Sequence, residues 1–170
     1  MALTGCQRSR ESSALLVGKV FPVTMLKTLD GDTVVLADYC GKVLVINFWA
    51  TWCVPCRHEM PDLQRLSDQL DSERYRVLGV SVDSDVNLVR EFKLSFGIQF
   101  ADLIDPQGVV AERQLQLSGY PQTFILSPDR VVVKQLMGIH EWNGAAMLET
   151  LDEAYNSGLV DNIARECAAA

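Results

Sequence analysis

The middle of the chain alternates between apolar runs of two kinds, and these runs predict strands and helices in turn. Residues 43–49 form a nearly continuous β-branched and aromatic run, which is typical of a strand covered on both faces. The segment after residue 56 instead has an apolar stripe at helical spacing: Met60, Leu63, Leu66 and Leu70. Pro61 lies inside this helical pattern, where its missing N–H donor predicts a kink.

The other runs extend the alternation to residue 155. Residues 17–36 hold two apolar runs around Asp30-Gly31-Asp32, which predicts a hairpin. Strands are predicted at 75–82 and 100–104, a second hairpin at 122–137, and helices at 86–96, 109–114 and 143–155. The last helix is expected to turn Ala146, Leu148 and Leu151 inward. This order predicts an α/β domain with a mostly parallel central sheet and an antiparallel hairpin at one edge.

Length and composition suit one compact domain. The chain has 170 residues, of which 48% are hydrophobic and 22% charged. We expect the domain at 17–158, with an N-terminal tail at 1–16 and a C-terminal tail at 159–170. The net charge of -7 makes nucleic acid an unfavourable partner, because an acidic surface repels phosphates. No apolar run reaches the ~18 residues of a membrane helix.

The five cysteines are too scattered for a small disulfide-stapled fold, and just one pair is close in sequence. Cys53 and Cys56 form a Cys-x-x-Cys motif between the strand at 43–49 and the helix that follows. At a helix N-terminus, unpaired N–H groups and the helix dipole stabilise a thiolate. We therefore predict a redox couple, with Cys53 as nucleophile and Cys56 as resolving thiol, that needs no cofactor.

Metal binding is the main alternative use of such a pair. A structural zinc site needs four ligands, but the other cysteines and the two histidines are isolated in sequence, so no metal site is predicted. A copper-binding metallochaperone stays open, since soft thiolates hold Cu(I). The spacing of the pair argues against a metallochaperone, because related copper carriers favour Cys-x-x-x-Cys with a distant histidine, which is one residue longer than Cys-x-x-Cys.

The longer block around the pair is Asn47-Phe48-Trp49-Ala50-Thr51-Trp52-Cys53-Val54-Pro55-Cys56-Arg57-His58-Glu59-Met60-Pro61. It resembles the active-site block of the TlpA/ResA/CcmG (DsbE) group of thioredoxin-like thiol–disulfide oxidoreductases, over residues 22–155. The resemblance implies a thioredoxin-like fold, with a central mixed β-sheet flanked by helices. It also implies an N-terminal β-hairpin and an extra strand–helix insertion within 75–96.

The resemblance further implies a setting and partners. Members of this group are usually periplasmic or extracytoplasmic and anchored by a lipid or an N-terminal helix. They generally reduce oxidised protein thiols, such as those of apocytochrome c or copper-site proteins, and receive electrons from a membrane thiol-reductant transporter. We expect the same of this chain, as a monomer.

Three positions outside the cysteines gain a role from the resemblance. Glu59 matches a glutamate near the disulfide that exchanges a proton with the resolving cysteine, although an exposed helix carboxylate is its plainer interpretation. Tyr120-Pro121 resembles the cis-proline loop that presents backbone to an extended substrate. Trp52 is expected to shield the disulfide, Trp49 to lie in the core, and Asn47 to position or pack.

The remaining cysteines need separate explanations. Leu3-Thr4-Gly5-Cys6 resembles a bacterial lipobox, which predicts lipidation of Cys6 and a chain that begins inside a signal peptide. Cys40 and Cys167 are expected to be free or incidental, although a disulfide between them is compatible with the sequence.

Two other redox enzymes are weaker matches. A DsbA-type oxidase commonly has a Cys-Pro-His-Cys core, which differs from Cys53-Val54-Pro55-Cys56. A peroxiredoxin-like peroxidase needs a Pro-x-x-x-Thr-x-x-Cys frame, which the residues before Cys53 do not supply. The sequence leaves the reduction potential anywhere between about -270 and -120 mV.

Overall fold

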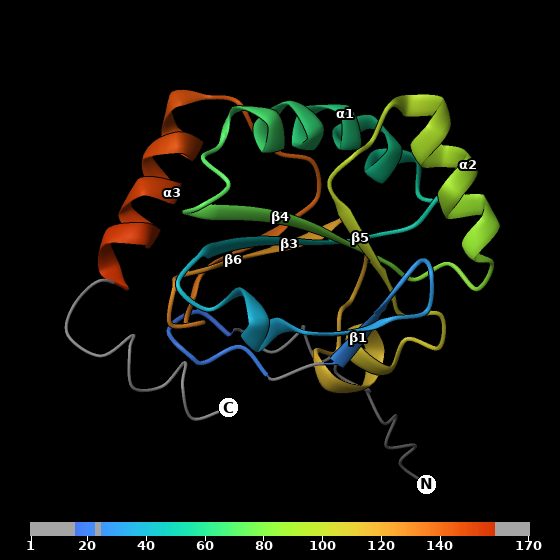
Figure 1. Cartoon of the computed structure of the whole chain (residues 1–170), viewed down its shortest axis with the longest axis horizontal. Helices are drawn as coiled ribbons and strands as arrows, with labels where there is room; N and C mark the ends of the chain where they lie inside the picture. The colour runs from blue at the N-terminus through green and yellow to red at the C-terminus, as the bar shows by residue number, and fades with distance from the viewer. Residues whose placement is uncertain (1–15, 23–24, 159–170) are drawn as a thin grey trace, which may run out of the picture.

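The computed structural model describes residues 16–22 and 25–158 (Figure 1). Its strands are β1 (Met25–Thr28), β2 (Thr33–Val35), β3 (Val43–Trp49), β4 (Tyr75–Ser81), β5 (Ala101–Ile104), β6 (Gln122–Leu126) and β7 (Val132–Met137). Its α-helices are α1 (Val54–Gln69), α2 (Val86–Phe96) and α3 (Ala145–Ser157). A 3₁₀ turn, η1 (Leu36–Tyr39), and a π-helical segment, η2 (Val109–Gln114), complete the described elements.

The seven strands form one mixed sheet in the order β2-β1-β5-β4-β3-β6-β7. The central strands β5, β4 and β3 run parallel, and β3 pairs antiparallel with β6. An antiparallel hairpin closes each edge: β1–β2 on one side and β6–β7 on the other. The mixed sheet and the N-terminal β-hairpin are confirmed, but the expectation of a mostly parallel sheet with one edge hairpin was wrong, because β1–β2 forms a second edge hairpin that pairs antiparallel with β5.

Alternation along β3 builds two cores, one on each face of the sheet. Val45 and Trp49 face the three helices, together with apolar residues of α1, α2 and α3. Ile46 and Phe48 face the opposite side, where they pack with apolar residues of η1 and η2. Figure 1 shows α1 and α2 above the central strands β3 and β4, and η2, in gold, below them. The strand is buried on both faces, as its sequence predicts.

The helices follow their predicted stripes with one exception. α1 buries Met60, Leu63 and Leu66 and continues through Pro61 to Gln69. In α3 the buried residues are Met147, Leu151 and Ala154, whereas Ala146 is exposed. The inward position of Ala146 was therefore wrong, because the buried face follows the i, i+4, i+7 spacing that starts from Met147.

A buried ion pair joins α2 to the sheet behind the helices. The Asp102 carboxylate on β5 lies 2.9 Å from the Lys93 Nζ atom, and the Trp49 indole N–H donates to its other oxygen at 3.2 Å. Gly79 on β4 makes room for this carboxylate, since a Cβ there would lie 2.0 Å from Asp102 Oδ1. We call this group the Asp102 corner. Within the described residues, none of the helices is both long and apolar enough to cross a membrane.

Candidate active site

Cys53 and Cys56 are joined by a disulfide at the N-terminus of α1, where β3 leads into the helix. Cys53 is the N-cap residue, and its sulfur accepts a hydrogen bond from the Cys56 backbone N–H at 3.2 Å. Cys53 keeps 6% of its surface exposed, whereas Cys56 has none. Of the two sulfurs, Cys53 is therefore the one a partner can reach. The helix dipole favours negative charge at this position.

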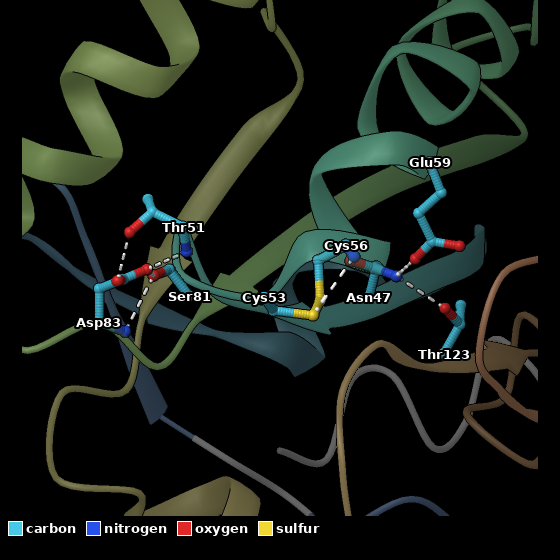
Figure 2. The surroundings of a disulfide bond; sticks show 8 residues. All are labelled: Asn47, Thr51, Cys53, Cys56, Glu59, Ser81, Asp83 and Thr123. Atoms are coloured by element: carbon cyan, nitrogen blue, oxygen red, sulfur yellow. Dashed lines mark hydrogen bonds between the residues drawn. A yellow bond between two sulfur atoms is a disulfide. The ribbon is translucent and has the colours of Figure 1, made fainter.

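Polar side chains at the end of β4 and just after it fix the loop between β3 and the disulfide (Figure 2). The buried Asp83 carboxylate accepts the Thr51 backbone N–H at 2.8 Å and the Thr51 hydroxyl at 2.7 Å. The Ser81 hydroxyl donates to the same carboxylate at 2.8 Å. These bonds hold the backbone two residues before Cys53 against the end of the neighbouring parallel strand.

Glu59 lies one turn after Cys56, and only 1% of its surface is exposed. The Asn47 amide on β3 donates to Glu59 Oε1 at 2.8 Å, and the same nitrogen donates to the Thr123 hydroxyl on β6 at 2.9 Å (Figure 2). The Trp142 indole N–H donates to Glu59 Oε2 at 3.1 Å. Glu59 is thus not the exposed helix carboxylate that its position in the sequence also allowed. Asn47 has the positioning role predicted for it.

Burial raises the pKa of Glu59 to about 7, from 4.5 for the free side chain. The hydrogen bonds from Trp142, Asn47 and the His140 backbone act in the opposite direction, and the nearby Asp62 charge adds a smaller increase. Desolvation outweighs the hydrogen bonds because none of these neutral donors supplies the positive charge that would compensate an ionised carboxylate. A carboxyl group with this pKa can both give and take a proton near neutral pH.

The loop before β6 faces the disulfide region with a cis Tyr120–Pro121 peptide bond, as the sequence predicts. The Pro121 carbonyl accepts the Gly138 N–H at 2.9 Å, which ties the loop to the end of β7. The Tyr120 ring meets the Trp52 ring edge-on at 6.0 Å. Trp52 is 64% exposed, so it projects from the surface beside the disulfide.

The other predicted residues divide between those the structure describes and those it does not. Arg57 and His58 are exposed on α1, and Trp49 is fully buried, as expected. Cys40 is disulfide-bonded, so the expectation that it is free was wrong: it follows η1, outside the active site, and a lone cysteine in a sequence does not show which segments the fold brings together. Cys6 and Cys167 lie outside the described residues, and their predicted roles remain predictions.

Two contributors to the site were missed from the sequence. Asp83 and Trp142 lie 30 and 89 residues from Cys53 along the chain. For Asp83 a signal existed, because it follows a predicted strand parallel to 43–49, and the carboxyl ends of parallel strands share an edge. No signal in the sequence pointed to Trp142, since no local pattern places a loop residue against a helix 83 residues earlier.

A Cys-x-x-Cys disulfide at a helix start, next to a cis-proline loop on a mixed sheet, defines a thioredoxin-like thiol–disulfide oxidoreductase. The chain belongs to the AhpC/TSA family, which it matches over residues 17–135. It is an enzyme of the ResA/DsbE type.

Named relatives agree with this class. The chain is 35% identical over 127 residues to the thioredoxin-like protein YneN of Bacillus subtilis, covering 73% of each. It is 34% identical over 128 residues to the thiol-disulfide oxidoreductase ResA of Geobacillus thermodenitrificans, covering 75% of this chain and 73% of ResA. A Chlorobium tepidum crystal structure, described as a candidate thiol:disulfide interchange protein DsbE, superposes with a TM-score of 0.74 at 26% identity. That match covers 83% of this chain and 99% of the other.

Proposed function

We propose that this protein reduces disulfides in other proteins, outside the cytoplasm, with Cys53 and Cys56 as its dithiol. The observation that supports the proposal is the carboxyl of Glu59, which is buried one helical turn after Cys56 and has a pKa raised to about 7. A resolving thiol must lose its proton before it can attack, and a buried base close by meets that need.

The reaction proceeds in two exchanges. The Cys53 thiolate attacks one sulfur of a substrate disulfide, the substrate S–S bond breaks, and the other substrate sulfur leaves as a thiolate that takes up a proton. Cys56 then loses its proton and attacks the Cys53 sulfur, which breaks the mixed disulfide and releases the second substrate thiol. Two electrons pass to the substrate, and the enzyme is left with the Cys53–Cys56 disulfide.

Each nearby residue has a role in this sequence. Glu59 accepts the Cys56 proton, and Asn47 and Trp142 hold its two oxygens in place. Asp83 keeps Thr51 and the loop before Cys53 in position. Trp52, Tyr120 and Pro121 form the surface on which the substrate lies, and an extended segment pairs with the backbone of Tyr120.

The setting of the reaction follows from the resemblance to the TlpA/ResA/CcmG group. The substrates are oxidised protein thiols, such as those of apocytochrome c or copper-site proteins, or oxidised thiols in general. The electron donor is a membrane thiol-reductant transporter, and Cys6 carries the lipid that anchors a periplasmic or extracytoplasmic monomer. The names of YneN and ResA support the thiol chemistry alone.

The first test is the equilibrium reduction potential of the pair, measured in dithiothreitol or glutathione buffers with Cys53→Ser as control. We expect a reversible two-electron couple near -270 mV, the reducing end of the thioredoxin-like range. A value near -120 mV would contradict the direction we propose and favour disulfide formation. If no couple titrates, the redox role fails, and protection of both cysteines from alkylation by Cu(I) would then support the metallochaperone.

A kinetic test addresses Glu59 itself. In Glu59→Gln the attack by Cys53 should persist, while release of the substrate from the mixed disulfide slows by about 10²-fold at pH 7. Rapid acid quenching of the reaction, with mass spectrometry of the trapped species, would show the mixed disulfide accumulating. Equal rates of release in variant and wild type would remove Glu59 from the mechanism.

A further inference from the structure

An open groove of about 490 Å³ lies beside the disulfide, between the start of α1 and the end of α2. We call it the α1–α2 groove; it is lined by Val54, Arg57, His58, Pro61 and Phe96. Because Val54 directly follows Cys53, the groove begins one residue from the reactive sulfur. Its volume lies within the range of protein binding sites.

The groove has exposed apolar walls. Val54 is 60% exposed and Phe96 is 44% exposed. Together with Trp52, they place three large apolar side chains on the surface around Cys53. Apolar groups gathered at one place on a soluble surface are typical of a binding site, because covering them removes apolar area from water.

The groove also has one fixed positive charge. The Arg57 guanidinium lies 5.9 Å from the centre of the Phe96 ring, so the charge adjoins the exposed apolar wall of the groove. Across the described part of the chain, no carboxylate lies within ion-pairing distance of Arg57. Its charge is therefore available to a partner, in a protein whose net charge is -7. A guanidinium binds a carboxylate through two parallel hydrogen bonds.

We propose that the α1–α2 groove selects oxidised protein segments in which an apolar and an acidic residue flank the reactive cysteine. The proposal rests on the proposed function. In the mixed disulfide the substrate cysteine is fixed at Cys53, so residues next to it must lie on the adjoining surface, at about 3.3 Å per residue. The apolar side chain packs on Val54 and Phe96, and the acidic one pairs with Arg57. Arg57 gives such a segment a local attraction on a protein whose net charge is -7.

The test uses symmetrical disulfides of single-cysteine peptides, so that attack on either sulfur is equivalent. Three peptides carry Phe-Glu, Phe-Gln or Phe-Lys on both sides of the cysteine. The fully reduced protein is mixed with each one, and the release of peptide thiol is followed at low and high salt. We expect the Glu peptide to react at least about fivefold faster than the Lys peptide, with the ratio falling as salt rises.

Variants identify the residue responsible through the ratio of the two rates, which cancels any change in the intrinsic reactivity of Cys53. Arg57→Glu should abolish or invert the preference for Glu over Lys, and Arg57→Gln should reduce it. Arg76→Glu makes the same change of charge on an exposed arginine near the start of β4, at the opposite end of the sheet from Cys53. This control should keep the wild-type ratio. Phe96→Ala should slow the Phe-Glu peptide more than an Ala-Glu peptide.

The outcomes separate the two proposals. If the protein reduces the peptides without preference, or if Arg57→Glu keeps the wild-type ratio, the groove is not a selective site, while the reductase function stands. If the protein reduces neither the peptides nor 2-hydroxyethyl disulfide, a small neutral substrate, the proposed function itself fails.

Discussion

Two of the buried carboxylates in the described part of the chain invite comparison, one behind the disulfide and one at the Asp102 corner. Both accept a hydrogen bond from a tryptophan indole: Glu59 from Trp142 and Asp102 from Trp49. Burial raises the pKa of both. They differ in charge compensation, since Lys93 lies 2.9 Å from Asp102, whereas the donors to Glu59 are neutral.

The difference shows that burial alone does not prepare a carboxyl group for proton exchange. Lys93 lowers the pKa of Asp102 against the effect of burial, so the charge of Asp102 belongs to an ion pair that joins α2 to β5. Glu59 has no such partner, and its pKa of about 7 leaves protonated and ionised forms close in free energy. The same side-chain chemistry therefore supports structure in one region and reaction in the other.

The largest expected effect comes from removing the counter-ion at the Asp102 corner. Lys93→Met should lower the free energy of unfolding by about 3–5 kcal/mol, because it leaves a buried carboxylate without compensation. Urea denaturation of the oxidised protein measures this loss. Arg90→Met is a matched control on the same helix, since Arg90 pairs with the exposed Asp30 and should cost about 1 kcal/mol or less. Equal losses in the two variants would refute the contrast.

A pH series tests the absence of a counter-ion at Glu59. Its pKa is about 7 in the folded protein and 4.5 for the free side chain, so the folded state binds the extra proton between these values. Wild-type stability should therefore fall as pH rises from about 4.5 to about 7, by about 3 kcal/mol in total. Glu59→Gln lacks this loss. The unfolding free energy of Glu59→Gln, measured relative to wild type, should therefore increase by about 3 kcal/mol between pH 4 and pH 8.

The readout for Glu59→Gln is the urea unfolding free energy of the oxidised protein, in which neither Cys53 nor Cys56 titrates. Glu149→Gln, on the exposed face of α3, provides the control for loss of a carboxylate from the surface. If the unfolding free energies of Glu59→Gln and wild type change with pH in parallel, protonation of Glu59 does not contribute to the stability of the fold.

A smaller effect is expected at Trp142. Its indole lowers the pKa of Glu59, so Trp142→Phe should raise that pKa further and destabilise the ionised form by about 1.5 kcal/mol. The loss should be greater at pH 8 than at pH 4, where Glu59 is protonated in either protein. In a Glu59→Gln background the pH-dependent part should vanish. If it persists there, Trp142 acts through packing instead of through the carboxylate.

Local sequence was sufficient for most elements of the fold. The run at β3, the stripe of α1 and the end of α2 at Gly97 each depend on neighbouring residues, and Gly97 adopts a left-handed conformation with φ 66°. The edge where β1 pairs was not predictable, because a pairing between residues more than 70 positions apart leaves no periodic signal. The face of α3 was missed because Ala146 and Met147 are both apolar, and the contacts of Met147 decide which turns inward.

The site was predictable to the same extent. The redox pair was predicted from the Cys-x-x-Cys motif, whereas Glu59 and the cis-proline loop were expected from the family resemblance. The pKa of Glu59 does not follow from the local sequence, because it depends on burial in the folded protein and on hydrogen bonds from Asn47 and Trp142, which lie 12 and 83 residues away. The role of Asp83 was partly predictable. Its position after a strand can be predicted from the local sequence, but its hydrogen bond to Thr51 cannot.

Gly79 has a consequence for the sequences that this fold tolerates. It lies in the middle of β4, with no turn that calls for a glycine, yet a methyl group there would lie 2.0 Å from Asp102 Oδ1 and 3.0 Å from Trp49 Nε1. The ion pair on β5 therefore restricts the amino acids allowed on a neighbouring strand. In a saturation-mutagenesis library selected for folding, position 79 should accept alanine only together with a shorter, uncharged residue at position 102.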